Sequence, residues 1–123
     1  TFDVDHLILK NTKTANYQKR NLKNNISQYL MLKKYQLADS NHKELSKYCK
    51  KKIKFLSTAF EEKSLKLLEK YKLDYIKIPS GEITNYPLLK QISMLKKKVL
   101  LSTGMASLSE IRQALKVFRK KKI

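Results

Sequence analysis

The stretches YIKIPSGE (75–82) and KVLLSTG (98–104) decide the fold. Each begins with a short apolar run and ends in a hydroxyl residue and a glycine, which is typical of a buried strand followed by a loop. A related stretch, IKFLST, occupies 53–58. The serine near the end of each stretch recurs after 23 and then 22 residues, at Ser57, Ser80 and Ser102. A step of this length predicts consecutive strand–helix units, which form parallel sheets.

Segments of helical periodicity separate these strands. Apolar residues recur at helical spacing over about 61–71, 85–95 and 107–119. Pro87 is tolerated in the first turn of a helix, and Ser107 and Glu110 have the spacing of a capping box. Earlier in the chain, we expect a long polar loop over 1–25. Two helices should follow it, over 26–35 and 39–49.

The order of these elements predicts an α/β fold in which helices cover a parallel sheet. We predict strands at 53–58, 74–79 and 98–102. The last two should be adjacent and parallel, with Ser80 and Ser102 on the same rim, because the repeat places equivalent residues at equivalent strand ends.

The size and composition of the chain limit its organisation. Its 123 residues and 14.5 kDa allow one small domain. The single cysteine, Cys49, excludes an intramolecular disulfide framework and a cysteine-cluster metal site. No membrane span or signal peptide is visible, so the expected location is the cytoplasm. Because the chain opens on Thr1 and closes in a lysine run, we expect it to be an internal piece of a longer protein.

The charge balance is strongly basic. Lys and Arg total 28 against 10 Asp and Glu, which gives a formal net charge of +18. Arg20, Arg112 and Arg119 are the only arginines, whereas direct readout of bases relies on bidentate arginine. A lysine-rich solvated surface is therefore favoured, while a general anion-attracting field and a dedicated nucleic-acid face stay open.

Candidate site residues gather where the predicted strands end. In parallel α/β folds this rim carries the active site, and the helix N-termini that follow each loop favour anions. Thr58, Ser80 and Ser102 would supply hydroxyls, and the two glycines could let backbone approach a ligand. Lys77 lies within an apolar strand and needs a solvated cavity or a partner. Glu82 follows in the same loop as a candidate base.

Simpler interpretations stand beside each of these. The hydroxyls could cap helices, and Lys77 could lie on an exposed edge strand. Glu82 could be no more than a carboxylate in the first turn of a helix, where the helix dipole favours negative charge. His6 and His42 lack partners at metal-ligand spacing and are interpreted as surface or packing residues. Cys49 is interpreted as a small core residue. Asp3 and Asp5 form too common a pattern to indicate a site.

Three strings together carry a resemblance to a known family. They are KFLSTAF (54–60), YIKIPSGEITN (75–85) and LLSTGMA (100–106), in this order and spacing. In these strings the chain resembles the sialic acid (N-acetylneuraminate) synthase family, which also includes legionaminic and pseudaminic acid synthases. Ala59 departs from the family pattern, because many relatives have proline there in an STPF string.

The resemblance implies a (β/α)8 TIM barrel of which 1–123 is only a part. The chain would provide the third, fourth and fifth strands with their helices, about three βα units, and the helical stretch before them. It is not a complete barrel, and the C-terminal antifreeze-like domain is absent from it. The divalent metal of the family, Mn2+ or Mg2+, would be held by residues outside this segment. The intact enzyme is expected to be a homodimer.

The implied reaction condenses phosphoenolpyruvate with N-acetylmannosamine or a related N-acyl hexosamine, giving a nonulosonic acid and phosphate. The phosphoenolpyruvate-binding positions of the family fall on Thr58, Lys77, Ser80 and Ser102. Its loop carboxylate falls on Glu82, so Glu82 and Lys77 are the expected catalytic residues. A non-catalytic basic α/β module that binds nucleic acid is the competing interpretation, and no membrane partner is expected.

Overall fold

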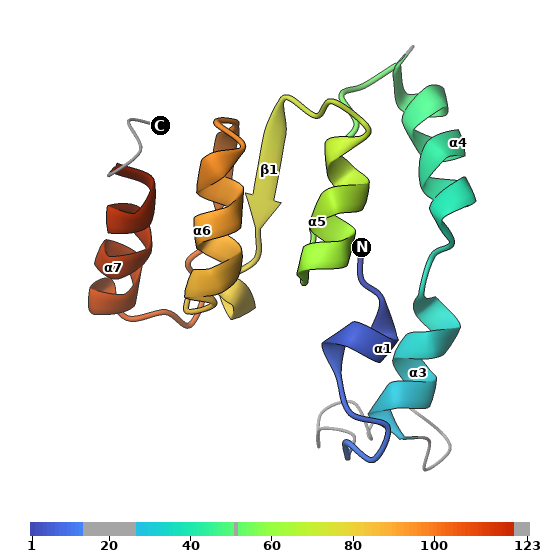
Figure 1. Cartoon of the computed structure of the whole chain (residues 1–123), viewed down its shortest axis with the longest axis horizontal. Coiled ribbons are helices and arrows are strands. Elements are labelled where there is room, and N and C mark those ends of the chain that lie inside the picture. The colour runs from blue at the N-terminus through green and yellow to red at the C-terminus, as the bar shows by residue number, and fades with distance from the viewer. Residues whose placement is uncertain (14–26, 51, 120–123) are drawn as a thin grey trace.

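The computed structural model describes residues 1–13, 27–50 and 52–119. From residue 28 onward its helices and its two strands follow the predicted order (Figure 1). Most of them are shorter than predicted, although the helix that begins at Asp39 ends one residue later. The elements are α1 (Val4–Leu7), α3 (Gln28–Tyr35), α4 (Asp39–Lys50), α5 (Glu62–Glu69), β1 (Tyr75–Ile78), the 3-10 turn η1 (Ser80–Glu82), α6 (Tyr86–Met94), β2 (Lys98–Leu101) and α7 (Leu108–Arg119). The predicted loop over 1–25 includes α1, and its residues from 14 onward lie outside the described part.

The sheet consists of β1 and β2, which pair in parallel from Tyr75↔Lys98 to Ile78↔Leu101. The predicted adjacency of these strands is therefore confirmed. The predicted strand at 53–58 is wrong in extent, since only Thr58 pairs, through a single parallel bridge to Lys77. Ile53 is 70% exposed, so packing does not hold the start of that segment in an extended ladder.

One face of the sheet is covered and the other is bare. Ile76 and Ile78 point into a core shared with α5, α6 and α7, which lie beside one another (Figure 1). Alternation along a strand places Tyr75 and Lys77 on the opposite face. Their partners there include Leu100, which is 43% exposed. The fold is thus a layered α/β segment, and the described residues do not close a barrel.

The helix caps explain where the strand–helix loops end. Asn85 caps α6 by accepting a hydrogen bond from the Leu88 N–H, and Pro87 lies in the first turn as predicted. The capping box before α7 is also confirmed, since Ser107 Oγ accepts from the Glu110 N–H and Glu110 Oε2 accepts from the Ser107 N–H. These caps fix the residues at which the loops after β1 and β2 end and the next helices begin.

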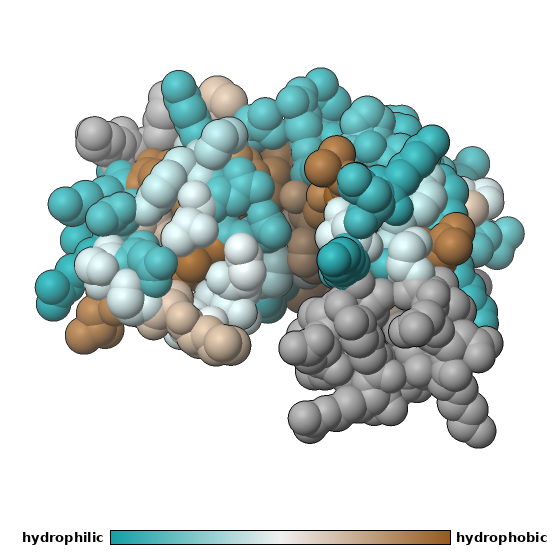
Figure 2. Space-filling view, turned by 90° about the horizontal axis from the view of Figure 1, so that it is seen from below, coloured by the Kyte–Doolittle hydropathy of each residue, from teal (hydrophilic) through white to brown (hydrophobic). Residues whose placement is uncertain are grey.

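Figure 2 views the molecule from the end of the sheet where the strands finish. Hydrophilic and weakly polar residues cover much of the surface there, interrupted by apolar patches.

Candidate functional site

Lys77 is the charged group at the centre of the candidate site. Its Nζ donates to Ser102 Oγ at 2.7 Å and to the carbonyl oxygen of Ile78 at 3.1 Å. The residue is half-buried and lies between β2 and the Thr58 bridge, so it is not an edge-strand lysine. An ammonium group has three donors, and these two contacts leave one to direct at a ligand.

Thr58 and Ser102 flank Lys77 on the same face. Bridge partners in a parallel pair present their side chains to the same side, so Thr58 shares the face of Lys77. The Ser102 N–H donates to the Ile78 carbonyl at 3.0 Å, which extends the ladder beyond β2. The structure therefore brings Thr58, Lys77 and Ser102 together at one end of the sheet.

Ser80 joins this group through the neighbouring loop. A Cβ placed on Gly104 would lie 3.7 Å from Ser80 Oγ, so the loops after β1 and β2 touch. Ser80 and Ser102 lie on the same rim, as predicted. Neither glycine has a positive φ, whereas Met105 does, at 63°. The glycines are thus not required by backbone conformation, and a Cβ at Gly104 would make only an ordinary van der Waals contact with Ser80.

Glu82 is oriented differently from the hydroxyl cluster. Its Oε2 accepts a hydrogen bond from Asn85 Nδ2 at 2.7 Å, next to the start of α6. It lines a cavity of about 390 Å³ together with His6, Glu61 and Gln91. Lys77 does not line that cavity, and the described residues contain no ion pair between the two. The structure thus places the Glu82 carboxylate against Asn85 and not against Lys77.

The donor set of the rim suits an anion better than a metal ion. Hydroxyls and an ammonium group donate hydrogen bonds to phosphate and carboxylate oxygens. Within 1–13, 27–50 and 52–119, no group of three His, Cys, Asp or Glu residues could hold a metal ion. The described residues therefore do not fit a resident divalent metal.

The other residues that the sequence singled out differ in burial. His42 is buried, and its Nδ1 lies 3.1 Å from the carbonyl oxygen of Ala38, as expected of a packing histidine. His6 is exposed. Cys49 is only partly buried, so its assignment to the core is wrong. It lies near the end of α4, a helix whose described hydrophobic side chains contribute none of the buried core.

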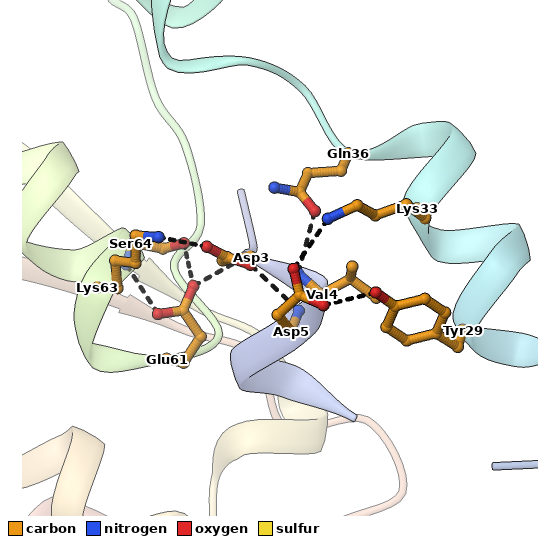
Figure 3. Close-up of polar contacts among 9 residues, drawn as sticks. All are labelled: Asp3, Val4, Asp5, Tyr29, Lys33, Gln36, Glu61, Lys63 and Ser64. Atoms are coloured by element: carbon orange, nitrogen blue, oxygen red, sulfur yellow. Dashed lines mark hydrogen bonds and ion pairs between the residues drawn. The ribbon is translucent and has the colours of Figure 1, made fainter. Parts of the chain in front are cut away.

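Sequence reasoning missed a polar network that connects the first residues to the start of α5 (Figure 3). Asp3 pairs with Lys63 at 2.5 Å, and the Asp3 N–H donates to Glu61 Oε1 at 3.0 Å. Asp5 accepts from Tyr29 and Lys33, and these contacts lower the pKa of its carboxyl. The spacing of Glu61 and Ser64 was a weak signal, because glutamate is not a preferred N-cap residue.

Comparison with known proteins places this geometry in a family. The chain matches the NeuB family over residues 1–123. It is 47% identical over 121 residues to the N,N'-diacetyllegionaminic acid synthase of Campylobacter jejuni, covering 98% of this chain and 36% of that protein. It is 40% identical over 116 residues to the enzyme of the same name from Legionella pneumophila, covering 94% of this chain and 33% of that protein.

A solved structure shows the same arrangement. The N-acetylneuraminic acid (sialic acid) synthetase of Leptospira borgpetersenii, in complex with citrate, matches with a TM-score of 0.74 and 31% identity, over 87% of this chain and 38% of that one. The chain thus spans about a third of the length of these relatives. No helix in the described part of the chain has the length and apolarity to cross a membrane. On this evidence the chain belongs to the NeuB family.

Proposed function

We propose that the chain is part of the catalytic (β/α)8 barrel of a nonulosonic acid synthase. In this proposal the intact enzyme condenses phosphoenolpyruvate with N-acetylmannosamine or a related N-acyl hexosamine and releases phosphate. The observation that carries it is the Lys77 ammonium, held by Ser102 Oγ on the face that also presents Thr58. The family membership supports the same reaction class.

The geometry prepares Lys77 for an anionic substrate. Two acceptors fix the position of its Nζ before a ligand arrives, so little side-chain freedom is lost on binding. The charge would meet phosphate or carboxylate oxygens of phosphoenolpyruvate, and charge-assisted hydrogen bonds are the stronger kind. Thr58, Ser80 and Ser102 would add neutral donors that set the orientation of the substrate.

Glu82 would act on the water that adds to phosphoenolpyruvate. Asn85 fixes its carboxylate through one oxygen, which is how a base is held in a defined orientation. We assign to it the activation or orientation of the water that adds to C2 of phosphoenolpyruvate. Polarisation of the sugar aldehyde is expected from Mn2+ or Mg2+, with ligands outside this segment.

A second candidate is a legionaminic acid synthase. The specific observation in its favour is that the Campylobacter and Legionella relatives, at 47% and 40% identity, both carry that name. The acceptor would then be a diacetylated hexosamine. Both candidates use the same phosphoenolpyruvate site. The proposal also includes a cytoplasmic, homodimeric full-length enzyme with small-molecule substrates and neither a membrane nor a nucleic-acid partner.

The test compares two lysines in the full-length protein. Lys77→Ala should lower kcat/KM for phosphoenolpyruvate about ten- to a hundredfold, the usual cost of a lost charge-assisted contact. Lys116→Ala, on the exposed surface of α7, should change it little. Repeating both assays at raised ionic strength separates a local contact from a long-range field. Equal and salt-sensitive losses in the two variants would refute the site assignment.

A further inference from the structure

The first residues of the chain run along the loop that carries Thr58. The main-chain nitrogen of Thr1 donates to the Thr58 carbonyl oxygen. The Phe2 and Phe60 rings meet edge to face with centroids 6.4 Å apart. The Asp3 N–H donates to Glu61 Oε1 at 3.0 Å. Three successive residues of one segment are thus in contact with the other, so the loop depends on that segment for its position.

Glu61 is the side chain that connects the loop to both of its neighbours (Figure 3). Its Oε2 accepts from the Ser64 N–H at 2.9 Å, which caps α5, and its Oε1 accepts from the Ser64 hydroxyl as well as from the Asp3 N–H. Ser64 is 4% exposed, so these contacts are shielded from water. Both carboxylate oxygens are therefore used, and one of them leaves its own helix to reach a distant segment.

The length of the side chain distinguishes this role from ordinary capping. Aspartate, serine or threonine would cap α5 at least as well as glutamate. An aspartate carboxylate lies about 1.5 Å nearer the main chain, one carbon–carbon bond less. It would keep the contact within α5 and lose its reach to the Asp3 N–H. A helix cap does not need glutamate at this position, whereas a bridge to Asp3 does.

We propose that Glu61 is a positioning residue that holds Thr58 in place for the anionic substrate. The inference rests on the proposed function, since it assigns a role within the same phosphoenolpyruvate site. Glu61 lies three residues beyond Thr58, and Ala59 between them is 2% exposed and packed in the core. With both ends held, the loop has little freedom, and releasing Glu61 lets the Thr58 hydroxyl move relative to Lys77.

The test uses the full-length protein and four variants. Glu61→Asp keeps the cap, and Glu61→Gln replaces one acceptor with an amide that faces the Ser64 donors. Both should raise KM for phosphoenolpyruvate about three- to tenfold, with KM for the sugar and kcat within twofold. Glu69→Gln removes one negative charge, as Glu61→Gln does, but from an exposed site on α5. It should leave both KM values and kcat unchanged. Thr58→Ala provides the reference for losing the hydroxyl itself.

The double variant Thr58→Ala with Glu61→Asp decides how Glu61 acts. If Glu61 works through Thr58, the double variant should be no worse than Thr58→Ala alone. Additive losses, or a KM for phosphoenolpyruvate unchanged in Glu61→Asp while Thr58→Ala is impaired, would overturn this inference and leave the proposed function standing. A Thr58→Ala variant with normal phosphoenolpyruvate kinetics would also overturn this inference, whereas normal kinetics in Lys77→Ala would overturn the proposed site itself.

Discussion

Lys77 shows how a single charged residue is accommodated in an apolar strand. Its neighbours Ile76 and Ile78 are 2% and 1% exposed, and they supply the packing that holds β1 against the helices. Because side chains alternate along a strand, the lysine points to the other face, where Ser102 Oγ and a backbone carbonyl accept hydrogen bonds from its ammonium group. Among the residues that the structure describes, the Lys77 ammonium group is thus oriented by neutral acceptors and has no anionic partner.

Asp3 offers a pH-dependent test at the same scale. Its side chain is 15% exposed, and the hydrogen bond from Lys63 holds the pKa of its carboxyl below the ordinary 3.8. A depressed pKa stabilises the fold above the unfolded-state pKa, and the contribution is lost as the pH falls through the folded value. Asp3→Asn in the full-length protein should therefore cost about 1 kcal/mol or less at pH 7.

The measurement is the urea midpoint of wild-type and Asp3→Asn protein at pH 7, 5 and below 3.8. The difference between the two should be constant from pH 7 to 5 and shrink below the ordinary aspartate pKa. Asp74→Asn is the control, because the Asp74 side chain, which pairs with Lys54, is 60% exposed and its loss should matter less. A difference that grows toward acid pH would contradict the assigned pair.

At the scale of elements, α6 shows how a helix covers the sheet. Leu88, Leu89 and Ile92 are buried on one side, and Met94 is 56% exposed on the other. The buried side packs with Ile76 and Ile78. This is the helical periodicity that the sequence displays, and it determines which side faces the core. The rim loops keep their places because this layer holds the strands.

Leu89→Ala should therefore destabilise the full-length protein by about 2 to 5 kcal/mol, the cost of a buried leucine truncated to alanine. The side chain is 0% exposed, so its loss leaves a cavity. Leu108→Ala removes the same atoms from a side chain that is 71% exposed and should change the free energy of unfolding by about 0.5 kcal/mol or less. Equal changes in the urea midpoint would show that α6 does not cover the sheet as described.

At the scale of the whole molecule, the sheet is covered on one side only. Leu100, on the bare face, is 43% exposed, and β2 has no strand partner on its outer edge among the described residues. Exposed apolar faces and open edges promote association. Completing a barrel would cover both, because the bare face would become its interior and the edge would meet the next strand.

The chain of 1–123 expressed alone should consequently be marginally stable, prone to associate and without synthase activity. Its net charge of +18 opposes association at low salt, so oligomers should increase as salt screens that charge. Light scattering against ionic strength, a thermal melt and a phosphate-release assay check these expectations. A monomer that melts cooperatively and turns over substrate would contradict them.

Much of the element order and part of the site follow from local patterns in the sequence. The strands at 74–79 and 98–102, the helices between them and the capping box of Ser107 and Glu110 were predictable, because strand and helix periods and cap chemistry act over a few residues. The shared rim of Ser80 and Ser102 followed from the repeat of strand–helix units. Apart from that rim, each of these features depends on residues that are close together in the sequence.

Only the tertiary structure decided the rest. The segment at 53–58 forms a single bridge because a strand requires partners along its length, and local apolar character does not supply them. Glu82 turns to Asn85, and Glu61 reaches Asp3 from 58 positions away in the sequence. The 2.7 Å contact between Lys77 and Ser102 likewise arises from strand register. Such contacts depend on how separate elements pack against one another. Patterns of neighbouring residues in the sequence do not determine that packing.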